Sequence, residues 1–166
     1  MLVLSTALAG APVPSATSHH EVVRLEPGDD PRGRLEALQR ERGWQAASVV
    51  SAVGSLTVAA IRYADREETT LLRGPLEVTS LSGTLGPDGP HLHLSVADGR
   101  GRTRGGHLSA GSAVYTTLEL VVLVLDDVTF HREPDPVTTW RELVPRRSRT
   151  PGGRDTTVPL EPQEQP

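Results

Sequence analysis

From Gln45 onward the chain is a succession of apolar, β-branched segments separated by turn signals, and this pattern limits the fold more than any other feature of the sequence. Such segments are typical of β-strands. We expect strands over residues 46–53, 58–63, 69–72, 76–85, 91–96, 103–108 and 118–125. A bend is expected at Gly54-Ser55, and turns are expected at 73–75 and 86–89. The sequence therefore predicts an α+β domain with a mostly antiparallel twisted sheet and few flanking helices.

One of these segments, 118–125, is the longest apolar run and is interrupted only by Glu119. Its β-branched content predicts a central strand that is covered on both faces. A glutamate in such a strand needs a partner, so Glu119 becomes a residue of interest.

Helix signals are few. After a first strand over 21–25, Asp30 can cap a helix, Pro31 fits its first turn and Gly43 supplies a stop, which predicts a helix over 31–42. Near the other end we expect a strand end at 129–132 and a short turn of helix over 138–143.

The chain divides into a flexible leader over 1–18, a single domain over 19–144 and a disordered tail over 145–166. The leader has the small residues of a signal peptide but no basic residue before its short apolar run. We therefore expect a cytoplasmic protein, with secretion as the alternative. No stretch is long and apolar enough to cross a membrane.

Composition excludes several functions. The 166 residues contain no cysteine, which rules out thiolate metal sites, thiol nucleophiles and disulfides. A net charge of −4 does not favour nucleic-acid binding, which depends on neutralising phosphates. Four arginines near the end form a local basic cluster that we interpret as part of a solvated tail: Arg146, Arg147, Arg149 and Arg154.

Three histidines bracket a predicted hairpin and suggest a metal site. His91 and His93 are two residues apart on a strand, so they share a face of the sheet. If the return strand pairs about Gly99, position 91 lies opposite His107, which puts a third imidazole on that face. Three nitrogens with an open fourth position make a catalytic-type zinc set, although imidazole also suits copper, nickel and iron. The alternative is three unrelated residues on a solvated hairpin.

Several other residues are candidates for a role around this site. Gly105 and Gly106 would let the backbone approach a metal or another subunit closely. Glu77 and Glu119 are candidates for a general base, an orienting partner of a histidine, or a fourth ligand. Alternatively, Glu77 faces solvent and Glu119 forms a structural pair at a subunit interface. The hydroxyl groups of Tyr115 and Thr116 are candidate donors to a substrate carbonyl. Three further histidines are interpreted as surface residues: His19, His20 and His131.

The order of sequence blocks from about 20 to 144 resembles the PPC domain, the plant and prokaryote conserved domain that is joined to AT-hooks in plant nuclear proteins. The resemblance rests on the blocks LEPGDD at 25–30, SVVSAVGSL at 48–56, EVTSLSGTL at 77–85, HLHLSVAD at 91–98, GGHL at 105–108, YTTLEL at 115–120 and WREL at 140–143. It implies a homotrimer and, more distantly, the fold of acetolactate decarboxylases, in which three histidines hold zinc. His91, His93 and His107 match the prokaryotic pattern.

The chain departs from the plant members in two places. The AT-hook core is missing, since Gly152-Gly153-Arg154-Asp155 lacks its proline, and the partner-binding block becomes Gly74-Pro75-Leu76-Glu77-Val78. The expected function is therefore a metal-binding homotrimer, with zinc as cofactor, that acts as a small-molecule enzyme or sensor. A DNA-associated or partner-binding regulatory module is the alternative, and a third reading is that the metal is purely structural.

Overall fold

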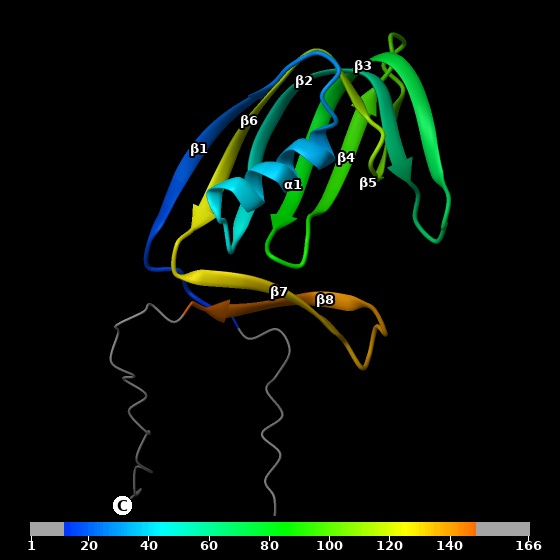
Figure 1. The fold of residues 1–166 in the computed structure, drawn as a ribbon. Coiled ribbons are helices and arrows are strands. Elements are labelled where there is room, and N and C mark those ends of the chain that lie inside the picture. Colours follow the sequence, from blue (N-terminus) through cyan, green and yellow to red (C-terminus); the bar gives the residue numbers. More distant parts are fainter. Residues whose placement is uncertain (1–11, 149–166) are drawn as a thin grey trace, which may run out of the picture.

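The computed structural model describes residues 12–148 and consists of a mostly antiparallel β-sheet with one short helix within that range (Figure 1). The elements in chain order are β1 (Ser18–Leu25), α1 (Pro31–Arg42), β2 (Ala47–Arg62), β3 (Thr69–Leu85), β4 (His91–Ala97), β5 (Thr103–Leu108), β6 (Ala113–Leu125), β7 (Val128–Pro134) and β8 (Arg141–Arg147). This arrangement confirms the predicted fold class.

Six strands form the main sheet in the order β1-β6-β2-β3-β4-β5. Strand β2 also pairs with β5, through Ile61 with Leu108 and Arg62 with His107, so the sheet curls back on itself at that end. Strands β7 and β8 form a separate hairpin that lies across the lower end of the sheet in Figure 1.

Helix α1 begins and ends where its local signals predict. The Asp30 side chain accepts a hydrogen bond from the backbone N–H of Arg32, and Pro31 opens the helix. Gly43 adopts the left-handed conformation that ends it, with φ of 70°. Leu35 is fully buried and joins the core beneath the sheet.

Strand β6 lies between β1 and β2, as expected of a central strand, but only one of its faces is covered in the single chain. Leu118 and Leu120 are buried on the inner face, whereas Glu119 is exposed on the outer face. The prediction of cover on both faces is therefore wrong, because the only helix within residues 12–148 packs on the inner side and β7–β8 lies elsewhere.

Two predicted breaks are absent. Strand β2 continues through Gly54, whose position for a side chain lies 2.1 Å from the backbone oxygen of Thr117, so this glycine permits close strand packing and does not make a bend. Strand β3 continues through Gly74-Pro75, at a register shift where the two residues lie opposite Thr57. Proline is tolerated in a strand at such an irregularity.

The helix expected over 138–143 is replaced by a turn and strand β8. The Asp135 side chain accepts hydrogen bonds from the N–H groups of Val137 and Thr138, which closes the turn between β7 and β8. Strand β8 then runs to Arg147, three residues into the expected tail. The rest of that tail, from 149, and most of the leader, 1–11, lie outside the described residues. None of the described helices has the length and apolar character to cross a membrane.

Candidate metal centre

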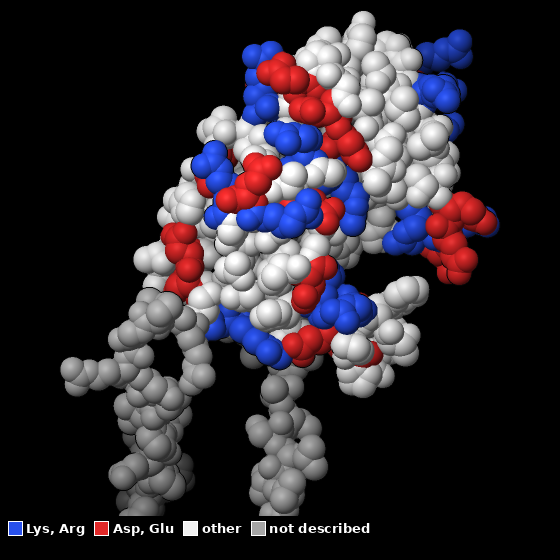
Figure 2. All heavy atoms as spheres, viewed as in Figure 1, with Lys and Arg blue, Asp and Glu red and all other residues white. Residues whose placement is uncertain are grey.

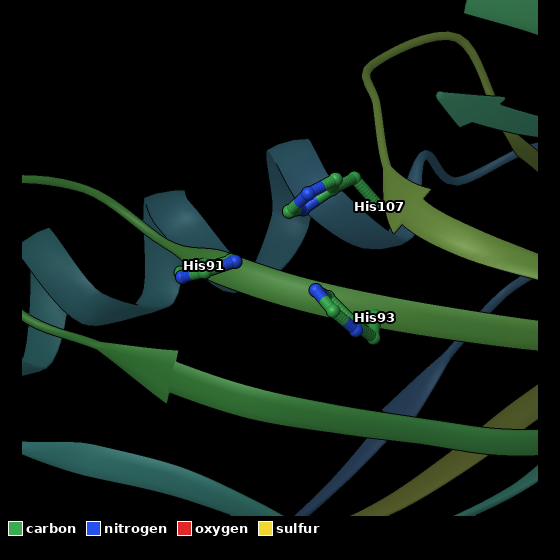
Figure 3. A group of neighbouring side chains, drawn as sticks. All are labelled: His91, His93 and His107. Atoms are coloured by element: carbon green, nitrogen blue, oxygen red, sulfur yellow. The ribbon is translucent and has the colours of Figure 1, made fainter. Parts of the chain in front are cut away.

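Strands β4 and β5 hold the three histidines side by side (Figure 3). Along β4, Leu92 and Leu94 face the core, which turns His91 and His93 to the opposite face of the strand. His107 lies near the end of β5, and Figure 3 shows its ring directed toward the space that the other two share. The predicted common face is confirmed.

The register of this hairpin differs from the predicted one by two residues. His107 pairs with His93, and not with His91. The tip holds Asp98 to Arg102, so the centre of the hairpin is Arg100 and not Gly99. Because side chains alternate with a period of two, a shift of two leaves all three imidazoles on the same face.

The imidazoles form a compact group. Ring centroids are 5.3 Å apart for His91 and His93, 5.1 Å for His91 and His107, and 4.5 Å for His93 and His107. Each residue offers a ring nitrogen within 4.8 Å of those of the other two. This is the one group of three or more His, Asp or Glu side chains within residues 12–148 that has the spacing of a metal site.

His91 fits a metal ligand better than it fits a hydrogen-bonded core residue. Its Nε2 atom is buried and has no hydrogen-bond partner among the described residues. Burial lowers the pKa of His91 to about 4, helped by the positive charge of Arg132. Burial also lowers the pKa of His107, and the positive charge of Arg62 lowers it further. Neutral imidazole is the form that binds a metal, and a buried nitrogen without a partner is unfavourable unless something occupies it.

The glycines before His107 serve close packing within the chain. A side chain at Gly106 would lie 2.6 Å from the backbone oxygen of Arg62 on β2, and one at Gly105 would lie 2.4 Å from Oγ of Ser95 on β4. The expected close approach is therefore made to neighbouring strands of the same chain. It holds β5 firmly against both, and so fixes the position of His107.

Helix α1 also positions the histidines. Nη1 of Arg32 donates hydrogen bonds to the backbone oxygens of Pro90, 3.3 Å away, and Leu108, 3.4 Å away. Pro90 precedes His91 and Leu108 follows His107. One guanidinium therefore joins the start of β4 to the end of β5, beside two of the three candidate ligands.

A cavity of about 1050 Å³ opens beside His91 and His107. Its wall combines α1, the β2–β3 connection, both histidine strands and the β7–β8 hairpin. The charged side chains of this wall are five arginines and three acids: Arg32, Arg62, Arg66, Arg132 and Arg141, and Asp65, Glu67 and Glu142. The exposed ring of Trp140 lies at its edge. The site thus has both candidate ligands and space for a small molecule.

The two predicted carboxylates lie elsewhere. Glu77 is exposed on β3 and pairs with Ala97, four residues beyond His93, or about 13 Å along the strand. Glu119 is exposed on β6 and pairs with Val53 and Arg24. Neither belongs to the histidine group or lines the cavity.

The carboxylate that the structure brings to the site is Glu142, on β8. It lines the cavity, and its negative charge acts on His91 by raising that pKa, against the larger effect of burial. Arg132 on β7 reaches the same place, with Nη2 donating to Thr84 Oγ1. Sequence reasoning missed both residues, because they come from a hairpin that the sequence pattern did not predict.

The remaining candidates fall outside the cavity wall. Thr116 shares a hydrogen bond with Ser55, 2.8 Å between hydroxyl oxygens, and Tyr115 is half exposed on β6. Two arginines of the expected basic cluster belong to β8 and form ion pairs: Arg146 with Glu133, and Arg147 with Asp127. Arg149 and Arg154 lie outside the described residues. On the face drawn in Figure 2, acidic and basic side chains intermingle over helix α1.

Comparison with known proteins identifies the family. Residues 14–126, more than half of the chain, match the model of the Plants and Prokaryotes Conserved (PCC) domain. A Bifunctional protein GlmU of Synechococcus sp. (strain JA-3-3Ab) is 49% identical over 140 residues, which is 83% of this chain but 22% of that protein. The chain therefore spans about a fifth of the length of the curated relatives that it matches.

Solved structures agree with this match. A hypothetical protein from Salmonella cholerae-suis is 41% identical, with a TM-score of 0.79, over 81% of this chain and 97% of the other. A metal-containing protein from Archaeoglobus fulgidus is 30% identical, with a TM-score of 0.68, over 81% and 99%. Together with the curled antiparallel sheet and the histidine hairpin, these matches show that the chain belongs to the Plants and Prokaryotes Conserved domain family, also written PPC.

Proposed function

We propose that this PPC domain binds a divalent transition metal, zinc, through His91, His93 and His107, and that it acts on or senses a small molecule in the adjoining cavity. The buried Nε2 atom of His91 carries the proposal, because no described side chain or backbone group satisfies it. Two more imidazoles within reach complete a three-nitrogen set. The metal-containing relative from Archaeoglobus fulgidus supports the same reading.

His91, His93 and His107 would hold the zinc ion, which would supply an open position able to polarise a carbonyl or lower the pKa of a bound water. The chain's own residues supply the rest of the site. Arg32 fixes the two strands that carry the ligands, and Glu142 offers a carboxylate on the cavity wall that can take or return a proton. Thr138 Oγ1 donates a hydrogen bond to Glu142 and holds that carboxylate in place.

Metal content measured by mass spectrometry tests the proposal. We expect close to one zinc per chain after zinc is supplied, and loss of that metal in His93→Ala. His93 is exposed, so its truncation should leave the fold intact. The matched control is His20→Ala, which removes an exposed histidine from β1 and should retain the metal. Wild-type protein that takes up no zinc would contradict the proposal.

Thermal unfolding separates an open site from a purely structural metal. Metal that binds only the folded chain stabilises it by about 2.7 kcal/mol at a free concentration one hundred times the Kd. We expect the metal-free protein to remain folded and keep its oligomeric state, because the core lies on the opposite face of β4. Unfolding or dissociation on metal removal would instead show a structural metal.

We also propose that the outer face of β1, β6 and β2 packs against other copies of the chain, as a homotrimer. On this face Val22 is 83% exposed and pairs with Val121, and Val53 is 64% exposed and pairs with Glu119. Light scattering should give three chains for the wild type and fewer for Val53→Asp. The control Val137→Asp, at the turn of the β7–β8 hairpin where this valine is 88% exposed, should keep three. A monomeric wild type would overturn this proposal.

A further inference from the structure

Of the fifteen arginines within residues 12–148, twelve fall into two groups, and the other three, Arg73, Arg100 and Arg104, are exposed side chains without an ion pair in that range. Seven form ion pairs with acidic side chains: Arg24, Arg34, Arg40, Arg42, Arg102, Arg146 and Arg147. The five that line the histidine cavity form none with any described carboxylate, although three acids share that wall. Arginine is always charged at neutral pH and is rarely left unneutralised where it is partly buried.

Two of these five lie beside the histidine group: Arg62 pairs with His107 across β2 and β5, and Arg132 lines the cavity together with His91. Arg132 acts on His91 as the strongest neighbouring charge, and Arg62 does the same on His107. Their hydrogen bonds go only to neutral acceptors: Arg132 donates to Thr84 Oγ1 and the backbone oxygen of Arg141, and Arg62 donates to the backbone oxygen of Arg66. Each guanidinium has five N–H groups, so both retain donors for a ligand.

We propose that the cavity binds a small organic anion, with its carboxylate or phosphate group between Arg62 and Arg132 and its apolar body along the wall toward Trp140. This inference rests on the proposed metal site for the position of the anion, and names the class of molecule on which that site acts. A guanidinium pairs with carboxylate and phosphate oxygens through two parallel hydrogen bonds. The excess of arginines over acids on this wall favours an anionic ligand over a cationic one.

The cavity suits an organic anion better than a bare ion. Its volume of about 1050 Å³ far exceeds what phosphate alone fills. The charged residues share its wall with apolar ones: Ala64, Pro90, Leu92, Leu108, Ala110 and Trp140. Trp140 is 74% exposed, an unfavourable position for a large ring unless it packs against something. A planar group on the ligand would cover it.

Isothermal titration calorimetry on the full, zinc-loaded chain tests this assignment with benzoate, phenyl phosphate and neutral benzamide. We expect one or both anions to bind and benzamide to bind at least about 10-fold more weakly. The anion that binds more tightly distinguishes a carboxylate from a phosphate ligand. Equal affinity for benzamide and both anions would overturn the proposal.

Variants separate the arginines from the metal, which attracts anions by itself. Arg62→Gln and Arg132→Gln should each weaken anion binding by about 10-fold while metal content stays unchanged. Arg104→Gln on β5 is the matched control, since it removes the same charge from an arginine outside this cavity. If Arg104→Gln weakens binding as much as the other two variants, the assignment is wrong.

The same titrations on metal-free protein distinguish the two proposals. If the wild type takes up no zinc but still binds the anions, and loses that binding in Arg132→Gln, the arginine pocket stands and the metal site fails. If zinc binds with one ion per chain and the anions bind equally to wild type, Arg62→Gln and Arg132→Gln, the metal site stands and the anion pocket fails.

Discussion

At the tip of the β4–β5 hairpin, Asp98 accepts hydrogen bonds from the backbone N–H groups of Arg100 and Arg102 and from the Arg102 side chain. At the other end of the same hairpin, the buried Nε2 of His91 has no partner among the described residues, and the arginines nearby pair with no carboxylate. The two ends belong to the same pair of strands, β4 and β5. They differ in whether their polar groups are satisfied by the chain itself.

That difference separates residues that stabilise the fold from residues that serve a ligand. Local hydrogen bonds at the tip close the turn and fix the register of the two strands. The open end has the opposite character, because unsatisfied nitrogen and unneutralised charge lower stability unless a metal or ligand is bound. Binding sites commonly retain such unfavourable groups. We therefore attribute stability to the tip and the proposed binding to the open end.

Replacing one glycine beside the open end and one at the tip should give the largest difference in stability between the two ends. Gly83 lies on β3, next to the open end. In Gly83→Ala the new methyl group would lie 2.0 Å from the backbone oxygen of His91, at a φ of +138°. Strand β3 must then move away from β4, so we expect a loss of about 3 kcal/mol in the free energy of unfolding. Urea denaturation measures this loss, and metal content should fall with it.

Gly99→Ala is the control at the tip, since nothing lies within 4 Å of its added methyl group. We expect a change of less than about 0.5 kcal/mol, typical of an exposed substitution. Equal losses at Gly83 and Gly99 would show that the two ends are equally tolerant and would remove the contrast.

Removing the unsatisfied histidine should have opposite effects with and without metal. His91→Leu replaces the buried Nε2 by an apolar group, so the metal-free protein should gain about 1–2 kcal/mol in the free energy of unfolding. With zinc added, the wild type should gain stability and the variant should not. Thermal unfolding with and without zinc measures both effects.

His93→Leu is the comparison, because His93 is exposed and its replacement relieves no buried group. His93→Leu should no longer be stabilised by added zinc, but the free energy of unfolding of its metal-free form should not rise. If His91→Leu destabilises the metal-free protein, His91 contributes to the core and the unsatisfied nitrogen is not a cost to the fold.

The sequence predicts those parts of the fold that local signals determine. Helix α1 is one example, because Asp30, Pro31 and Gly43 act on neighbouring backbone groups. Gly54 and Gly74 are the opposite case, because glycine marks a turn as well as a close approach between strands. Only the partner strand distinguishes the two, and in β2 and β3 the strands continue. The exposure of one face of β6 was not predictable for the same reason, since the elements that cover a strand lie far away in the sequence.

The candidate site divides in the same way. The histidine group was predictable, because side chains alternate with a period of two along β4 and β5. A register error of two residues therefore leaves all three histidines on the same face. Glu142 and Arg132 were not, because their place depends on how the β7–β8 hairpin lies against the sheet. Glu77 and Glu119 had the right chemistry, but nothing in the sequence gave their distance from the histidines.

The smallest expected effect concerns the pH response of the tip. The hydrogen bond from the Arg102 side chain, with those from the N–H groups of Arg100 and Arg102, lowers the pKa of Asp98 to about 2 from an ordinary 3.8. Because the folded pKa lies below the ordinary value, the charged carboxylate stabilises the fold. That stabilisation is complete above about pH 4 and is lost as the pH falls toward 2.

Asp98→Asn should therefore be slightly less stable than the wild type at neutral pH, and the two should converge between about pH 4 and 2. Denaturation at a series of pH values measures the difference, and an NMR titration of the Asp98 carboxyl checks its pKa directly. The control is Glu68→Gln, which removes an exposed acid that forms no ion pair or side-chain hydrogen bond among residues 12–148. Its stability should differ from that of the wild type by the same amount at every pH between about 4 and 2.

Zinc binding at the other end should be the same in all three proteins, since Ala97, next to Asp98, lies four residues beyond His93, or about 13 Å along β4. A change in zinc affinity in Asp98→Asn would show that the two ends are coupled through the register of the hairpin.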